Sequence, residues 1–395
     1  MRTSGERRVA VTGMGVVSVC GIGLDAFFSG LHEPARPGSK LRVEDFDSSV
    51  WFDVKQARRA DRFQQFSVSS AQMALDDAGD LDVDVDPGRA GVVFGTGVGG
   101  LETLQEQIGV LLEKGPRRVS PFLVPMMMAN AGAAAISMRL GWRGPCETVV
   151  TACAAGTQAV GNAARLVSSG RCDVLMTGGA EAAVVEIGVA AFGNMTALST
   201  SGNSRPFDVR RDGFVIAEGG AALVLEEWDR AVARGARIYA EVLGSASTAD
   251  AHHITAPLPG GAGAIECMEL ALEDAGKRPG DVAHINAHGT STPLNDLAEA
   301  EAVEKLFGSP TPPVTSIKGV VGHSLGAAGA LEAVCSALTL HRKSIPPTAG
   351  LEELDPAIHL DVVTGTARPL DDGVVLSNSF GFGGHNGCLV LGPAS

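Results

Sequence analysis

The sequence predicts an α/β protein built from two related halves. Short apolar runs alternate with helical patterns along the chain, and many of its 51 glycines stand where an apolar run gives way to a helical pattern. A six-residue motif also occurs once in each half of the chain. Hydrophobic residues make up 45% of the 395 residues and charged residues 19%, which is typical of a compact protein with a large core.

Strands are expected in the short apolar runs and helices in the longer periodic segments between them. The expected strands are Arg8–Thr12, Gly91–Phe94, Thr148–Thr151, Val174–Thr177, Ala221–Leu225, Ala283–Asn286, Val374–Ser377 and Gly387–Leu391. The expected helices include Phe66–Asp77, Gly156–Val167, Gly263–Asp274 and Ala327–Thr339. Because strands mostly alternate with helices, the pattern predicts buried, largely parallel sheets.

The repeated motif indicates an internal duplication. Residues 74–79 read ALDDAG, and residues 271–276, 197 positions later, read ALEDAG. Each copy ends a predicted helix with glycine and is followed by an acidic loop, an apolar strand and a glycine turn. Six common residues alone could match by chance, but the same order of elements after both copies favours duplication. We expect one rigid body with halves of residues 1–247 and 248–395, joined near residues 245–255, and a shared site between them.

Composition excludes several classes of protein. The 31 Lys and Arg against 45 Asp and Glu give a net charge of −14, so nucleic acid is not expected as the main partner. The seven cysteines show no CxxC or Cys/His ligand spacing, so neither a disulfide framework nor a metal site is expected, and a reducing cytoplasm is favoured.

No nucleotide-binding loop or redox cofactor motif is present. The uncharged stretch 124–138 is too short for a membrane span, and the arginine-rich start resembles a buried strand more than a secretion signal.

Cys153 is the first candidate for chemistry. An apolar strand leads into a turn of small residues, and a helix is expected to begin at or just after the cysteine. At a helix N-terminus, the dipole and the free N–H groups favour a thiolate. The alternative is an inert buried cysteine, which is about as common. The other cysteines lack this strand, turn and helix setting.

Two histidines in the second half stand in similar glycine-flanked turns. His288 follows a predicted strand, and His323 lies five residues after Lys318 and just before a helix rich in Gly and Ala. A single histidine in such a turn is more often structural than catalytic. The two histidines together with Cys153 indicate a catalytic site more specifically than any of them alone. Near the C-terminus, the run Ser377–Gly387 carries glycines whose N–H groups could point at a substrate oxygen, although a plain tight turn is the simpler interpretation.

These motifs resemble those of the β-ketoacyl-acyl-carrier-protein synthases, and in particular the elongating type II enzymes. They are Thr151-Ala152-Cys153, His288 to Thr292, Lys318 with Gly322-His323, and Asn378 to Gly384, and they occur in the family's order. The resemblance extends from about Val9 to Val390, which is nearly the whole chain. It implies the thiolase fold, with five layers in the order α-β-α-β-α built from two halves.

The resemblance also implies roles for individual residues. Cys153 would take the acyl chain as a thioester, and His288 and His323 would stabilise the enolate formed when malonyl-carrier protein loses CO₂. Backbone N–H groups of Cys153 and Phe382 would form an oxyanion hole, and Lys318 with Glu332 would orient the histidines. Thr290 and Thr292 would contact phosphopantetheine, and Val98, Phe192 and Phe382 would form the acyl pocket and its gate. No cofactor is implied, because the substrates are carried on the carrier protein.

Two basic clusters could supply the docking site that an acidic carrier protein needs. The clusters are Lys55, Arg58, Arg59 and Arg62, and Lys114, Arg117 and Arg118. Most runs of charged residues in proteins are ordinary solvent-exposed surface with no binding role. The resemblance implies that Lys55, Arg58, Arg59, Arg117 and Arg118 bind the carrier protein. It also implies a homodimer in which each subunit borders the other's pocket.

Several alternatives stay open on the sequence alone. A thiolase would need a second catalytic cysteine in the glycine-rich turn, where this chain has His385, and a non-catalytic partner subunit would have lost the nucleophile. A ketosynthase of a type II polyketide or specialised lipid pathway would share the same chemistry. Departures from common relatives leave the fatty-acid and polyketide interpretations both open. They are Thr196, the short loop 199–205, His385, Asn295 and Leu297.

Overall fold

The computed structural model describes residues 6–81 and 85–394. Its framework is one continuous sheet of 11 strands, ten of which follow one another in an order that divides into two five-stranded sheets. The first has the order β5 (Cys146–Val149), β4 (Ala90–Gly95), β6 (Val174–Glu181), β8 (Gly219–Glu227) and β1 (Val9–Ser18). The second has the order β11 (Val314–Thr315), β10 (Val282–Asn286), β14 (Val374–Gly381), β15 (His385–Gly392) and β9 (Ala240–Ala249). Among the described residues, only two pairs, Ala10 with Glu241 and Val11 with Ala240, join the sheets through β1 and β9.

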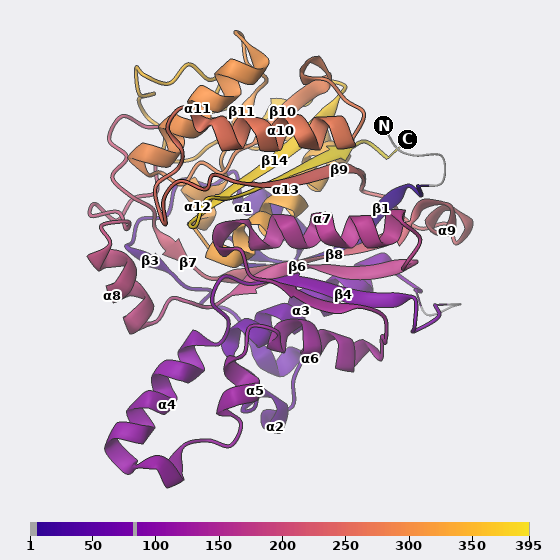
Figure 1. The fold of residues 1–395 in the computed structure, drawn as a ribbon, viewed down its shortest axis with the longest axis vertical. Coiled ribbons are helices and arrows are strands. Elements are labelled where there is room, and N and C mark those ends of the chain that lie inside the picture. Colours follow the sequence, from indigo (N-terminus) through magenta and orange to yellow (C-terminus); the bar gives the residue numbers. More distant parts are fainter. Residues whose placement is uncertain (1–5, 82–84, 395) are drawn as a thin grey trace.

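Helices form three layers around these sheets. Between the sheets lie α7 (Ala155–Ser168) and α13 (Ala328–Arg342), whose buried faces contact strands of both. Outside the first sheet lie α3 (Arg62–Ala78) and α6 (Ala131–Leu140), and outside the second lie α10 (Ala262–Asp274) and α11 (Pro293–Phe307), as Figure 1 shows. The expected five-layer α-β-α-β-α arrangement is therefore confirmed.

The expectation of largely parallel sheets is wrong. Of the nine pairings along the described strands only four are parallel, namely those that β4 makes with β5 and β6 and those that β10 makes with β11 and β14. The other pairings are antiparallel, because β14 turns directly into β15 and because β8 and β1 run against their neighbours. Burial on both faces gives antiparallel strands the same apolar pattern as parallel ones, so the sequence pattern did not distinguish them.

The two sheets repeat one topology, as duplication predicts. The helix that ends in the first copy of the motif, α3, precedes β4, and the helix that ends in the second copy, α10, precedes β10. β4 and β10 occupy equivalent places in the two strand orders. Part of the acidic loop after the first copy, residues 82–84, and the chain start, residues 1–5, lie outside the described residues. The boundary after residue 247 stays a prediction, and it falls within the continuous strand β9.

The central helices cross at their N-terminal ends with almost no space between them. Each helix follows a strained turn in which a non-glycine residue has a positive φ, 50° at Ala152 and 48° at Leu325. A Cβ added to Gly156 would lie 2.6 Å from the backbone nitrogen of Ala330, and one added to Gly329 would lie 2.1 Å from Thr157 Oγ1. Glycine at these two positions lets helices from different halves meet in contact.

Replacing Gly329 with alanine will therefore destabilise the protein by about 1–3 kcal/mol, because the added methyl group overlaps Thr157. A matched control is Gly109→Ala in the exposed helix α4 (Leu101–Lys114), where an added Cβ meets nothing within 4 Å. The control should be neutral or more stable by up to about 1 kcal/mol. Urea unfolding measures both, and equal midpoints for the two variants would contradict this packing argument.

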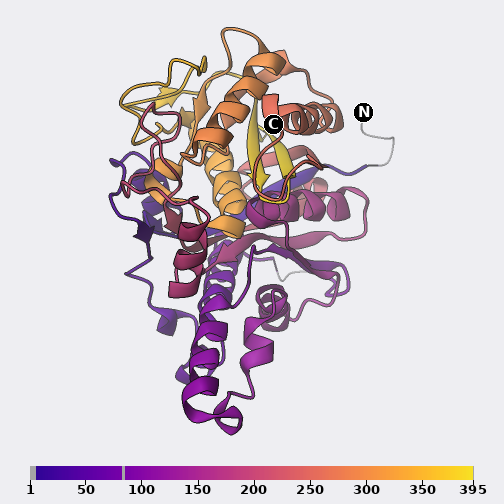
Figure 2. The same ribbon diagram turned by 60° about the vertical axis from the view of Figure 1, so that its left-hand side comes forward.

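Smaller elements complete the fold. A projecting arm is formed by α4, the 3₁₀ turn Pro116–Arg118 and α5 (Leu123–Met127), and it extends from the body in both Figure 1 and Figure 2. No helix among the described residues is long and apolar enough to cross a membrane. The remaining helices are α1 (Leu24–Gly30), α2 (Val54–Ala57), α8 (Glu186–Asn194), α9 (Trp228–Ala233) and α12 (Lys318–Val321), and the short strands are β2 (Gly21–Ile22), β3 (Lys40–Leu41), β7 (Ile216–Ala217), β12 (Ser344–Ile345) and β13 (Arg368–Pro369).

Candidate active site

Cys153 lies where the chain passes from the first sheet into a central helix. Strand β5 ends at Val149, a 3₁₀ turn covers Ala152–Ala154, and α7 begins at Ala155. The strained Ala152 turns the chain sharply, and Cys153 is buried at the start of the helix as predicted. The backbone N–H of Phe382, from the second half, donates a hydrogen bond to the Cys153 sulfur. A Cβ at Gly381 would lie 3.0 Å from the Cys153 nitrogen, so glycine there keeps the space beside this amide open.

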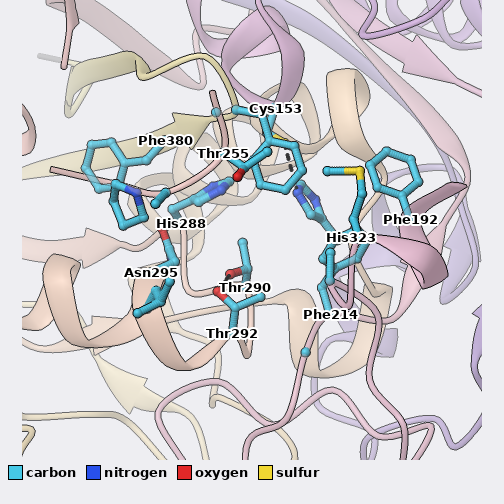
Figure 3. Close-up of a pocket in the computed structure, with 18 of the residues that line it drawn as sticks. Cys153, Phe192, Phe214, Thr255, His288, Thr290, Thr292, Asn295, His323 and Phe380 are labelled. Carbon is cyan, nitrogen blue, oxygen red and sulfur yellow. Dashed lines mark hydrogen bonds between the residues drawn. The ribbon is translucent and has the colours of Figure 1, made fainter. Parts of the chain in front are cut away.

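The two histidines meet Cys153 from the other half, as Figure 3 shows. His323 Nε2 lies 3.1 Å from Cys153 Sγ, and the His288 and His323 rings lie edge to face with centroids 5.4 Å apart. His288 is held through its backbone, because its N–H donates to Glu299 at 2.8 Å and that of Gly289 donates to the same carboxylate at 2.7 Å. The predicted Cys, His and His set is thus assembled from segments far apart in the chain.

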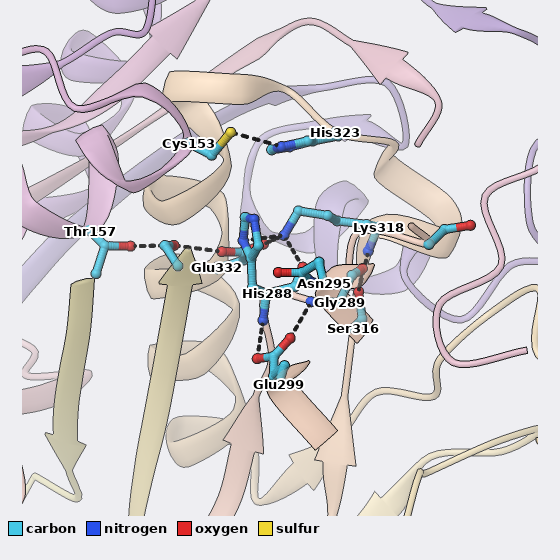
Figure 4. A network of polar contacts seen from close by, with 12 residues as sticks. Cys153, Thr157, His288, Gly289, Asn295, Glu299, Ser316, Lys318, His323 and Glu332 are labelled. Atoms are coloured by element: carbon cyan, nitrogen blue, oxygen red, sulfur yellow. Dashed lines mark hydrogen bonds and ion pairs between the residues drawn. The ribbon is translucent and has the colours of Figure 1, made fainter. Parts of the chain in front are cut away.

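Lys318 and Glu332 form a buried ion pair behind the histidines, as Figure 4 shows. Lys318 Nζ also donates to the backbone carbonyl of His288 and lies 3.4 Å from His288 Nδ1. The Ser379 hydroxyl donates to the second oxygen of Glu332 at 3.3 Å and is 2.7 Å from the Thr157 hydroxyl. This network joins α13, β14 and α7 and fixes the place of the His288 ring.

Burial controls the protonation of the site. Burial raises the pKa of the Cys153 thiol to about 11, and the Lys318 charge offsets only part of this effect. Burial, followed by repulsion from Lys318, holds the pKa values of His288 and His323 well below their usual range. The resting site therefore holds a neutral thiol and two neutral imidazoles. The helix start expected to favour a thiolate is present, but burial outweighs it.

Alkylation of Cys153 tests this protonation state. Because only the thiolate reacts, the rate with iodoacetamide should rise about tenfold per pH unit from pH 7 to 9.5, without the plateau above about pH 8.5 that an ordinary thiol gives. The modified peptide can be followed by mass spectrometry, with free glutathione as the control thiol. A plateau below pH 8 would mean that the thiolate is already formed in the resting enzyme.

A cavity of about 560 Å³ opens over Cys153 and both histidines. Apolar side chains, including Phe192, Phe214 and Phe382, form much of its wall, and the Phe192 and Phe382 rings lie 6.5 Å apart. Thr290 and Thr292, whose hydroxyls are 2.9 Å apart, lie on a polar side of it. Of the pocket residues that the sequence suggested, all but one line this cavity among the described residues.

The exception is Val98, which does not line the cavity and is 44% exposed. Its backbone N–H donates at 3.3 Å to Glu181, a buried carboxylate that sequence analysis missed. Glu181 also accepts hydrogen bonds from the amides of Gly97 at 2.6 Å and Gly326 at 3.1 Å, which joins the two halves. Glu299 was missed as well. An acidic residue inside an apolar segment, with no basic residue nearby in sequence, is the signal that could have found Glu181. Glu299 stands among other acidic residues of its helix, and the sequence does not single it out.

The predicted basic residues lie on the surface near the projecting arm. Arg58 and Arg59 come directly after the short helix α2. The Arg59 guanidinium carbon lies 4.4 Å from the centroid of the Phe122 ring, and Phe122 immediately precedes α5. That contact brings the two predicted clusters onto neighbouring segments. Arg62 differs, because it pairs with the buried Glu218 at 2.7 Å. The exposed members are Lys55, Arg58, Arg59, Lys114, Arg117 and Arg118.

Family models match most of the chain. The model described as "Beta-ketoacyl synthase, N-terminal domain" matches residues 32–231, and "Beta-ketoacyl synthase, C-terminal domain" matches residues 239–352. The chain belongs to the β-ketoacyl synthase family. A relative from Synechocystis sp., named 3-oxoacyl-[acyl-carrier-protein] synthase 2, is 44% identical and covers 98% of both chains. One of the same name from Rhizobium meliloti is 42% identical, again over 98% of each chain.

Solved β-ketoacyl synthase structures share the fold. The ishigamide ketosynthase/chain length factor superposes with a TM-score of 0.93 at 36% identity, covering 99% of this chain and 100% of that one. A β-ketoacyl synthase from Burkholderia phymatum gives 0.91 at 35% identity, covering 98% and 100%. The chain thus has the thiolase fold of this family of condensing acyltransferases, and the thiolase interpretation with a second catalytic cysteine is set aside.

Proposed function

We propose that this chain is a β-ketoacyl-acyl-carrier-protein synthase that joins an acyl thioester to malonyl-carrier protein, with loss of CO₂, and extends a fatty acyl chain by two carbons. The observation that carries the proposal is the contact of 3.1 Å between Cys153 Sγ and His323 Nε2, beside His288, at one wall of a largely apolar cavity. The cavity is suited to an acyl chain, and the thiol to a covalent thioester.

Acyl transfer begins with the neutral Cys153 thiol. Its sulfur attacks the thioester carbonyl of the acyl-carrier protein, and its proton passes to His323 Nε2 and then to the departing pantetheine sulfur. The N–H groups of Cys153 and Phe382 stabilise the tetrahedral oxyanion. Each such donor is worth roughly 10²–10³ in rate in comparable sites. Phe192 and Phe382 border the chain, and Thr290 and Thr292 hydrogen-bond the pantetheine arm.

Decarboxylation then uses both histidines. The bond to the malonyl carboxylate breaks, CO₂ leaves, and the electron pair moves to the thioester oxygen as an enolate. His288 and His323 donate hydrogen bonds to that oxygen from their Nε2–H groups. Once the sulfur is acylated it no longer has a proton to donate to His323, so the His323 proton can occupy Nε2. The enolate carbon attacks the acyl group, the bond between the acyl carbon and the sulfur breaks, and Cys153 leaves as a thiolate that takes up a proton from solvent. Lys318 faces His288 Nδ1, which keeps the His288 proton on Nε2, and Glu332 holds Lys318 in place.

Intact-protein mass spectrometry tests the proposal. The metal-free enzyme is mixed with acyl-carrier proteins bearing chains of four to eighteen carbons, and malonyl-carrier protein is added in a second step. We expect a single acyl adduct that disappears, with release of a β-ketoacyl-carrier protein, when malonyl-carrier protein arrives. Absence of an adduct at every chain length would overturn the proposal.

A second candidate is a ketosynthase of a type II polyketide or specialised lipid pathway. It is favoured by the likeness to the ishigamide ketosynthase/chain length factor and, at a TM-score of 0.91 and 29% identity, to a type II polyketide ketosynthase in complex with its acyl-carrier protein. The chemistry would be the same. The two candidates differ in the preferred chain, which is saturated for fatty-acid elongation and carries ketone or unsaturated groups for the alternative.

The docking of an acidic carrier protein is assigned to the exposed basic residues beside the arm. The double variant Arg117→Glu and Arg118→Glu should raise the carrier-protein KM at least about tenfold at low salt, because it places like charges against the partner. The value of kcat should change little. The double variant Lys277→Glu and Arg278→Glu, on the outer layer of the second half, changes the charge by the same amount and is the control. An unchanged KM in the Arg117→Glu and Arg118→Glu variant would rule out this docking face.

We further propose that two copies associate along β5, the edge strand of the first sheet. β5 pairs only with β4 within the described part of the chain, and apolar side chains beside it are exposed, with Met138 at 77% and Val150 at 50%. An unpaired edge flanked by apolar residues is suited to a second chain. Light scattering should give twice the monomer mass.

The seven free thiols support a cytoplasmic location.

A further inference from the structure

Three side chains that bind metals well converge at the wall of the cavity. One ligand atom from each of Cys153, His288 and His323 lies within 4.8 Å of the others, and all three residues are buried. Sequence spacing does not reveal the group, because the cysteine comes from the first half and the histidines from two separate loops of the second. The group qualifies as a ligand set only in the folded protein.

The separations are close to those of a tetrahedral site. Zn²⁺ lies about 2.3 Å from a thiolate and about 2.0–2.1 Å from an imidazole nitrogen, so ligand atoms around it are about 3.3–3.6 Å apart. Here Cys153 Sγ and His323 Nε2 are 3.1 Å apart, and no pair among the three chosen atoms exceeds 4.8 Å. Side-chain movements on the order of 1 Å would bring all three into place, and a fourth position faces the cavity.

We propose that Cys153, His288 and His323 bind a thiophilic divalent cation of the Zn²⁺ type, and that the bound ion blocks acyl loading. The inhibition of acyl loading rests on the proposed function, whereas the binding of the metal ion does not. The ion would occupy the space that the thioester carbonyl needs and would hold the sulfur in a metal bond. It would thus act as a reversible inhibitor competing with acyl-carrier protein.

Charge and protons balance in the binding step. The S–H bond of Cys153 breaks, its electron pair forms the bond to the metal, and the proton leaves through the cavity to water. His323 Nε2 is unprotonated and binds the ion without losing a proton. His288 binds through Nε2 after its proton has moved to Nδ1, while Lys318 keeps its contacts with the His288 carbonyl and with Glu332. The nearby positive charge of Lys318 opposes a cation, but its ion pair with Glu332 offsets this repulsion.

Cobalt spectroscopy tests the binding directly, without any measurement of activity. Co²⁺ is titrated into metal-free protein, where bonding to a thiolate gives a near-ultraviolet charge-transfer band and tetrahedral geometry gives strong visible bands. We expect both at one ion per chain, and their loss when Zn²⁺ is added. Cys153→Ser should remove the charge-transfer band, and His323→Ala should weaken binding at least about 100-fold. Cys267→Ser, which alters a thiol in the outer helix α10 that does not line the cavity, is the matched control and should leave both bands intact.

Two outcomes would overturn the site. One is a charge-transfer band that persists in Cys153→Ser or disappears in Cys267→Ser, and the other is equal affinity in the wild type and His323→Ala. A second measurement tests the block, because buffered Zn²⁺ should slow both acyl-adduct formation and iodoacetamide labelling of Cys153 by the same factor. The acyl adduct of the metal-free enzyme tests the proposed function separately, so the two failures are distinguishable.

Discussion

Replacing Cys153 with alanine will abolish acyl loading and condensation together. The sulfur is the nucleophile in the proposed reaction, and loss of a covalent nucleophile costs roughly 10⁴-fold or more in enzymes of this kind. Alanine fits the position, since Cys153 stands between Ala152 and Ala154 and starts a helix that alanine favours. The fold should therefore be retained.

Intact mass and the release of β-ketoacyl-carrier protein measure this loss, with circular dichroism to verify folding. Cys267→Ser, which changes a thiol in helix α10 outside the cavity, is the control and should form the adduct normally. A Cys153→Ala enzyme that still gains one acyl group would mean that another thiol is the nucleophile, and peptide mapping would identify it.

Removing either histidine will separate the two half-reactions. His288→Ala should slow malonyl decarboxylation by roughly 10²–10³ while acyl loading falls by less than about tenfold, because an enolate-stabilising donor is lost. His323→Ala should also spare loading more than decarboxylation, but less fully than His288→Ala does, because His323 Nε2 contacts the Cys153 sulfur at 3.1 Å. The structure therefore predicts a graded pair of effects.

Stopped-flow measurement of adduct formation and of CO₂ release gives the two rates separately. His341→Ala, in the last turn of α13 and not part of the cavity wall, is the control and should leave both rates unchanged. Equal loss of loading and decarboxylation in His288→Ala would contradict the assignment of that residue to the enolate step.

Much of this fold and site can be predicted from sequence, and the errors have physical causes. Cys153 and His288 are visible because each stands in a turn of small residues after an apolar strand, and His323 because it stands between glycines before a helix rich in Gly and Ala. The prediction of parallel strands was wrong, because strands buried on both faces have the same hydrophobic runs whether they pair in parallel or antiparallel. Arg62 seemed part of a surface cluster, but the fold brings the buried Glu218 against it. Glu181 holds the amides of Gly97 and Gly326, which are distant in sequence, so the sequence does not show what it contacts. Glu299 holds the nearby amides of His288 and Gly289, but it looks like its acidic neighbours in the helix.

The strained turn before each central helix has a consequence for stoichiometry. Cys153 follows Ala152 in one turn, and Gly326 follows Leu325 at the same place in the other. A Cβ at Gly326 would lie 2.1 Å from the Gly97 nitrogen, and the Gly326 amide is held by Glu181. No side chain can be added there. The duplicated fold thus retains two copies of a nucleophile-bearing turn but admits a reactive side chain in only one, so each chain can carry one acyl group at a time.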